Sequence, residues 1–265
     1  MSRLAADGIV TKSDKKEGRI IGRVLPGAVK LWLRTQVEQI DSLVIDLSGR
    51  DRQLLSGYIP GLAIAAEGVV YKGLNLSRVQ LGADDIRINL GQVVRGKPLR
   101  LMERFPVKGQ VMLSDQDFAA SVLSPLLAEG LADFWRSLVQ LPDFAQAVEA
   151  RYGVRSLQPD TRLHQSAIGL GDRCLALSFY PQSQGKVDQQ PISIGTELAV
   201  VSGHFLKLVS PCWLDDMSML SDLSQGEPIE ALSDFRLDLG EDTQITQLTL
   251  QPTQLTCMGQ VMVRP

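Results

Sequence analysis

Apolar residues recur at every second position between residues 43 and 113, and this alternation constrains the fold more than any other feature of the sequence. Successive side chains of a β-strand point to opposite faces, so each run gives a strand with one apolar and one polar face. Turn-forming residues, glycine above all, separate the runs, and Gly82 and Gly91 are among those predicted to lie in turns. The gaps are too short for parallel crossovers, so we predict an antiparallel meander. Its apolar positions are Leu43, Ile45, Leu47, Leu62, Ile64, Leu74, Leu76, Val79, Leu81, Ile86, Ile88, Leu90, Leu99, Leu101, Val111 and Leu113.

A helical region is predicted to follow this meander, over residues 114–140. Ser114 and Asp117 have the spacing of a capping box, and Pro125 is expected to bend the helix near its first turns. A further helix is predicted from about Asp143 to Tyr152, ending at Gly153. Alternating runs then resume over residues 168–208 and 235–263. Blocks of strands between helices are typical of an α+β fold with an antiparallel sheet.

The N-terminal region lacks the strand-like alternation of the residues that follow it. We predict residues 1–18 to be a flexible tail, and residues 19–265 to be one domain. Residues 19–40 have helical periodicity, with Pro26 opening the longer part of the helix. This helix would either cover the sheet or meet a membrane surface through its tryptophan and its cations. The residues that would touch the membrane are Arg19, Arg23, Lys30, Trp32 and Arg34.

Charge is distributed unevenly along the chain. The formal net charge is −3, yet residues 1–40 hold eight Lys/Arg and four Asp/Glu. A basic end on an acidic body favours an anionic partner, and we expect an anionic membrane surface. No secretory signal and no membrane-spanning run of ~18 apolar residues is recognised. The expected location is therefore cytoplasmic, peripheral on the inner face of a membrane.

Catalytic and metal-binding motifs are not recognised in the sequence. The two histidines, His164 and His204, lack partners at ligand spacing. Phosphate-binding loops, zinc-protease signatures and nucleophile elbows are missing. The acidic body lacks a basic strip interleaved with aromatic residues, which argues against nucleic-acid binding. We therefore expect no enzyme activity, no cofactor and no metal.

Two apolar features have both a structural and a functional interpretation. The loop around Trp213 is either a core plug or an exposed apolar tip. The apolar helix over residues 118–139 either fills an ordinary core or leaves a crevice for an acyl chain against the sheet. In the functional interpretation, the residues that contact lipid are Leu123, Leu127, Leu131, Phe134, Trp135, Leu138 and Trp213.

Several segments resemble one protein family. They are Leu54–Gly57, Ala66–Leu74, Val79–Leu81, Asp85–Ile88, Phe235–Leu239 and Leu255–Val263. Together they look like the bacterial LmeA-like phospholipid-binding family, first catalogued as a domain of unknown function. The resemblance implies a tubular, TULIP-like architecture, in which a curved antiparallel sheet wraps a long helix and encloses an apolar groove. It implies no catalytic residues.

The expected function is non-catalytic binding of a phospholipid or similar lipid at a membrane surface, with the acyl chains held in an apolar groove. The alternative is a structural or adaptor protein with a filled core, which docks a protein partner through the basic N-terminal helix.

Overall fold

Two fourteen-residue strands, β2 (Tyr58–Tyr71) and β3 (Leu74–Arg87), form the centre of the first sheet. They are joined by Lys72 and Gly73, whose φ angles of 49° and 75° match the tight two-residue turn that antiparallel hairpins favour. The predicted short runs are therefore merged into longer strands. Gly82, predicted as a turn residue, lies inside β3 and pairs with Ala63. The computed structural model describes residues 25–153, 162–183, 186–187 and 191–265.

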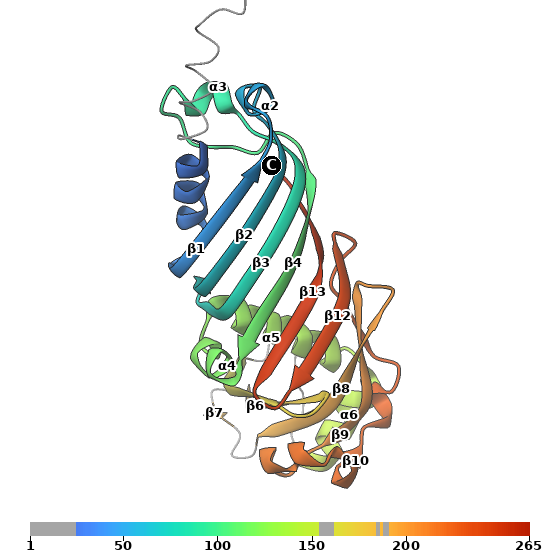
Figure 1. Cartoon of the computed structure of the whole chain (residues 1–265). Helices are drawn as coiled ribbons and strands as arrows, with labels where there is room; N and C mark the ends of the chain where they lie inside the picture. Colours follow the sequence, from blue (N-terminus) through green and yellow to red (C-terminus); the bar gives the residue numbers. More distant parts are fainter. Residues whose placement is uncertain (1–24, 154–161, 184–185, 188–190) are drawn as a thin grey trace, which may run out of the picture.

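The first sheet is six-stranded and antiparallel, with the order β1-β2-β3-β4-β13-β12 (Figure 1). The strands that flank the central hairpin are β1 (Gln39–Ser48), β4 (Phe105–Ser114), β12 (Thr243–Gln251) and β13 (Gln254–Val263). The predicted antiparallel meander over residues 43–113 is confirmed by β1 to β4, except that Ile88, Leu90, Leu99 and Leu101 lie outside these strands. Two short helices, α2 (Asp51–Leu55) and α3 (Leu90–Val93), lie at one end of this sheet.

One face of this sheet packs against helices, and we call it the helix-side face. The N-terminal helix (residues 25–36) buries Leu25 and Val29 against the strands, with Trp32 and Leu33 partly buried beside them. The predicted helix over residues 19–40 is therefore too long at its C-terminal end. Ile40 lies in β1 and pairs with Val69. Residues 1–24, which hold the predicted tail, lie outside the described residues.

The predicted helix over residues 114–140 is two helices, α4 (Asp115–Ser121) and α5 (Pro125–Val139). The break has a local cause: the Ser124 hydroxyl accepts a hydrogen bond from the Leu127 N–H at 3.1 Å, and Pro125 occupies the first turn of α5. The next helix, α6 (Pro142–Tyr152), is confirmed as predicted, with Gly153 at a left-handed φ of 68°.

The second sheet is built from the strands that follow α6. Its main path is β10-β9-β8-β6-β5, and β11 and β7 pair at its sides. The strands are β5 (Arg162–Leu170), β6 (Cys174–Ser183), β7 (Lys186–Val187), β8 (Ile192–Val201), β9 (Phe205–Trp213), β10 (Glu227–Pro228) and β11 (Arg236–Asp238). Three 3₁₀ turns lie after β9: η1 (Met217–Ser221), η2 (Leu223–Gln225) and η3 (Glu230–Leu232).

The α+β class and the antiparallel pairing are confirmed. The predicted wrapping of one sheet around a long helix is not confirmed. Helix α5 passes behind the lower part of the first sheet in Figure 1, but its most buried residues pack into the core of the second sheet. Among the described helices, none has the length and apolarity needed to cross a bilayer.

Candidate functional site

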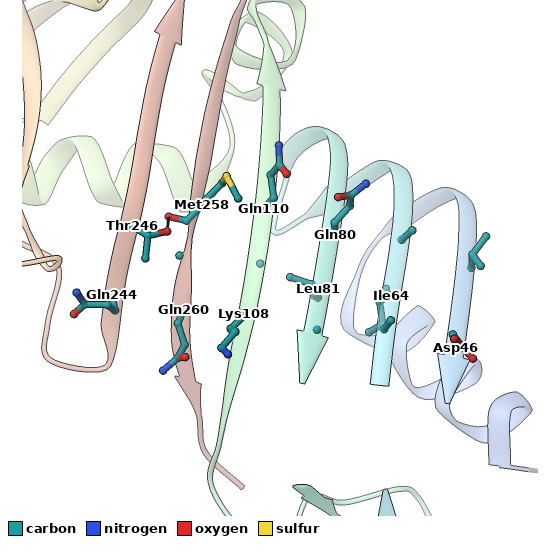
Figure 2. A pocket seen from close by; sticks show the side chains of 16 residues that line it. Asp46, Ile64, Gln80, Leu81, Lys108, Gln110, Gln244, Thr246, Met258 and Gln260 are labelled. Carbon is teal, nitrogen blue, oxygen red and sulfur yellow. Dashed lines mark hydrogen bonds between the residues drawn. The ribbon is translucent and has the colours of Figure 1, made fainter. Parts of the chain in front are cut away.

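A hollow of the first sheet lies on the face opposite the N-terminal helix, which we call the open face. It is a groove of about 670 Å³ that extends across all six strands (Figure 2). Directly paired residues of an antiparallel sheet share a face, so the strand register decides which side chains line it. One row of lining residues is Asp46, Ala63, Gly82, Lys108, Gln260 and Gln244.

A second row of lining residues runs beside the first, two positions along each strand. Its members are Val44, Ala65, Gln80, Gln110 and Met258, and Thr246 joins them from a β-bulge in β12. Both rows occupy positions that alternate with the buried residues of the helix-side face. The groove is therefore made from the outward-facing half of the strand pattern.

Small residues form the floor of the groove at its centre. Ala63 and Ala65 are exposed, and a Cβ added at Gly82 would meet no atom within 4 Å. Larger apolar side chains lie on either side, with Val44 65% exposed and Met258 37% exposed. The surface of the groove is therefore largely apolar at its centre.

Two glycines behind the groove allow the sheet to bend there. Gly109 and Gly259 are paired on the helix-side face. A Cβ at Gly109 would lie 2.7 Å from the Leu81 Cδ2 atom, and one at Gly259 would lie 2.5 Å from the Gln244 carbonyl oxygen. The bulge lies beside them, between Ile245 and Gln247, and a bulge bends its strand and increases the local twist.

The charged groups of the groove are few and far apart. Lys108 is exposed, and no ion pair of its amine is present in the part of the chain that the structure describes. Asp46 lies three strands away, which corresponds to about 14 Å between the backbones. The other polar groups that line the groove are mainly neutral side-chain amides, among them those of Gln80, Gln110 and Gln260. The groove therefore combines an apolar floor with a single cation.

The residues that line the groove do not form a set that is typical of acid–base catalysis or metal binding. Asp46 is the one carboxylate among the lining residues, so the groove has no carboxylate pair. No group of three or more potential metal ligands is found among the described residues. The arrangement is suited to holding a largely apolar molecule that carries an anionic group.

Four of the seven residues predicted to contact lipid are buried elsewhere. Phe134, Trp135, Leu138 and Trp213 are at most 8% exposed and belong to the core of the second sheet. The Trp135 ring lies 4.6 Å from the Phe179 ring, between centroids. Trp213 is therefore a core residue rather than an exposed tip.

The other predicted lipid contacts lie along α5 and the turn before it. Leu123 is 90% exposed, and Leu127 and Leu131 are half-buried. None of the seven residues predicted to contact lipid lines the groove on the open face. The crevice between helix and sheet stays a prediction.

The residues predicted to meet a membrane separate into two groups. Lys30 and Arg34 are exposed on the N-terminal helix, whereas Trp32 is half-buried and packs against the sheet. Arg19 and Arg23 lie outside the described residues. This part of the helix covers the sheet, and its contact with a membrane stays a prediction.

The groove residues are absent from the predicted contacts, although the sequence holds a signal for them. Ala63, Ala65 and Gly82 are small residues at positions where an exposed strand face usually has larger polar ones. Their cross-strand alignment follows only from the register of β2 and β3.

Comparison with known proteins gives one match. A family described as LmeA-like phospholipid-binding matches residues 17–260. No match is found among curated proteins, and none among solved structures.

Proposed function

The chain belongs to the LmeA-like phospholipid-binding family, and from this premise we propose that it binds a phospholipid in the groove on the open face. It does so without catalysis, as part of its action at a membrane surface. The observation that carries the proposal is the groove itself, which combines an apolar floor with one lysine that forms no ion pair with any residue that the structure describes.

An acyl chain lies along the floor formed by Ala63, Ala65 and Gly82, between Val44 and Met258. Removing both the chain and these exposed apolar surfaces from water is favourable, at about 25 cal/mol per Å² of apolar area. The volume of about 670 Å³ lies within the range of about 300–1,000 Å³ that is typical of small-molecule sites.

The phosphate lies beside Lys108. The neighbour of Lys108 on β3 is Gly82, so no side chain from that strand fills the space next to the amine. Its neighbour on β13 is Gln260, whose amide is a further hydrogen-bond donor. A hydrogen bond to a charged phosphate oxygen is stronger than one between neutral groups.

The test fills the groove without disturbing the core. Ala65→Trp places a large ring at an exposed position on the groove floor. Binding is measured by fluorescence titration with a phosphatidylglycerol that carries a fluorescent acyl chain. We expect Ala65→Trp to lose at least about tenfold in affinity, because the ring occupies the space of the chain.

The matched control is Ala167→Trp, the same change at an exposed alanine on a strand of the second sheet. We expect this variant to bind like the unchanged protein. Equal binding by both variants would place the lipid elsewhere, and the half-buried Leu127 and Leu131 on α5 would then be the next positions to change.

A further inference from the structure

We propose that one end of the molecule, which we call the basic tip, docks on the surface of an anionic phospholipid bilayer. The tip consists of the N-terminal helix (residues 25–36), residues 49–57 with α2, and residues 84–104 with α3. All three lie together at the upper end of the first sheet in Figure 1. The inference rests on the proposed function, which it extends by naming the surface that meets the membrane.

Exposed apolar side chains gather at the basic tip. Leu31 is 67% exposed, Val94 is 56% exposed and Met102 is 58% exposed. Leu31 lies on the outer side of its helix, next to Lys30 and Arg34 on the same arc of about 100°. Apolar side chains flanked by cations are the pattern of peripheral membrane attachment, in which the apolar groups enter the interface and the cations contact lipid phosphates.

Positive charge is concentrated at this end. The three segments hold nine Lys/Arg and four Asp/Glu, although the whole chain carries a net charge of −3. Glu103 pairs with Arg87, so one of the four carboxylates is already engaged by a cation of the tip. The exposed cations Arg95, Lys97 and Arg100 follow one another in the segment after α3. An anionic leaflet is complementary to this end and would be repelled by the acidic remainder of the chain.

The segment after α3 is held in place rather than extended freely into solvent. The Asn89 side chain accepts a hydrogen bond from the Arg100 N–H at 2.7 Å and donates one to the Pro98 carbonyl at 3.0 Å. The Met102 N–H donates to the Arg87 carbonyl at 2.9 Å. These bonds hold the backbone of the segment on the sheet, so little backbone entropy is lost when the segment meets a surface.

A hollow of about 520 Å³ separates the N-terminal helix from this segment. It is lined on one side by Leu31 and Trp32 and on the other by Val93, Lys97 and Leu99. An apolar recess with a lysine at its wall can accept part of a lipid molecule, which favours a bilayer over a flat protein surface.

The test is co-flotation of the full chain with vesicles of phosphatidylcholine containing phosphatidylglycerol. We expect the protein to float with these vesicles, and to float less at high salt because screening weakens surface electrostatics. Replacing Arg95 and Lys97 by glutamate should lower the bound fraction at least about tenfold, since two attractive charges become repulsive. Leu31→Glu should also weaken flotation, because it adds a negative charge that the leaflet repels and removes an apolar contact with the bilayer.

The matched control is Leu123→Glu, at the opposite end of the sheet. Leu123 is even more exposed, at 90%, and its neighbour Ser124 lies against Gly73 in the β2–β3 turn. The length of β2 separates the two ends by about 45 Å. Leu123→Glu should float like the unchanged protein, and all variants should keep its melting temperature, because every changed side chain is exposed.

The proposal is overturned if the unchanged protein does not float, if the charge-reversed variant floats equally well, or if Leu123→Glu is the variant that fails. A dimer that Leu31→Glu dissociates, seen by sedimentation without any flotation, would assign the tip to a second copy of the chain. Failure of the groove is distinguishable from all of these, because the fluorescent-lipid titration needs no bilayer and uses Ala65→Trp, far from the tip.

Discussion

Lys108 is the single cation among the residues that line the groove, and in the proposed site it contacts only the phosphate. The Lys108 amine lies beside Gly82, which has no side chain. In the proposed site this amine attracts the phosphate but does not contribute to binding of the acyl chain. The two contributions can therefore be separated by changing the residue and the ligand independently.

We predict that Lys108→Glu lowers the affinity for phosphatidylglycerol about tenfold or more, because an attraction becomes a repulsion. A diacylglycerol with the same acyl chains lacks the phosphate and should bind the variant and the unchanged protein alike. Titration calorimetry with both ligands checks this. If diacylglycerol binding falls as much as phosphatidylglycerol binding, Lys108 supports the shape of the groove and does not contact the phosphate.

Helix α4 is the element that ties the first sheet to the helices that follow it. The Ser114 hydroxyl accepts a hydrogen bond from the Asp117 N–H at 3.1 Å, and the Asp117 carboxylate accepts one from the Ser114 N–H at 2.7 Å. The same carboxylate accepts a hydrogen bond from the Ser77 hydroxyl on β3. Ser121, fully buried, accepts a hydrogen bond from the Asn75 N–H at 2.8 Å. Helix α4 is thus bound to β3 at both of its ends.

We predict that Asp117→Ala lowers the free energy of unfolding by about 1–2 kcal/mol near pH 7, the usual cost of losing a helix cap. Partial burial opposes ionisation, but the hydrogen bonds from Ser77 and Ser114 lower the pKa of Asp117 below its ordinary value. A lowered folded-state pKa adds stability above the unfolded pKa, and this stability is lost as the pH falls through the folded pKa. The gap between variant and unchanged protein should therefore narrow below about pH 4.

Urea unfolding at several pH values measures this gap. Asp115→Ala is the control, because the Asp115 carboxylate is exposed and accepts only from the Gln116 N–H in the described contacts. A gap for Asp117→Ala that is the same at pH 3 as at pH 7 would contradict the linkage to its ionisation.

Patterns of neighbouring residues predict most individual elements, because side-chain alternation and helix capping depend only on residues close together in the sequence. The alternation located β1 to β4, and the Ser114–Asp117 spacing located the start of α4. The pairing of β13 with β4 was not predicted, since nothing in the periodicity of residues 254–263 specifies a partner more than a hundred residues away. The turn prediction for Gly82 is wrong, because the sequence does not distinguish a glycine inside a strand from a glycine in a turn.

At the scale of the whole molecule, the chain forms two antiparallel sheets, one with a filled aromatic core and one with the groove. They meet through backbone hydrogen bonds, from the Ile245 N–H to the Gly203 carbonyl at 2.6 Å and from the Arg173 N–H to the Leu250 carbonyl at 3.2 Å. The second sheet takes up the aromatic residues of α5 and α6 as a filled core, and the first sheet holds the groove and the basic tip. The residues predicted to contact lipid include four that lie in this core, because periodicity shows which residues are apolar but not which sheet they cover.

The groove could not be predicted from apolar residues for a related reason. It lies on the face whose residues look polar in the alternation, and Gly109, Gly259 and the bulge in β12 meet there only through the pairing of the strands. The family resemblance predicts lipid binding, and the register of the strands is needed to identify the groove that we propose as its site.

Native mass spectrometry of the protein, purified from its own cells without detergent, tests the central claim most directly. We predict one phospholipid of defined mass on each chain, and a largely lipid-free chain for Ala65→Trp purified in the same way. A lipid-free unchanged protein would contradict phospholipid binding in the groove, and so would a phospholipid retained in full by Ala65→Trp.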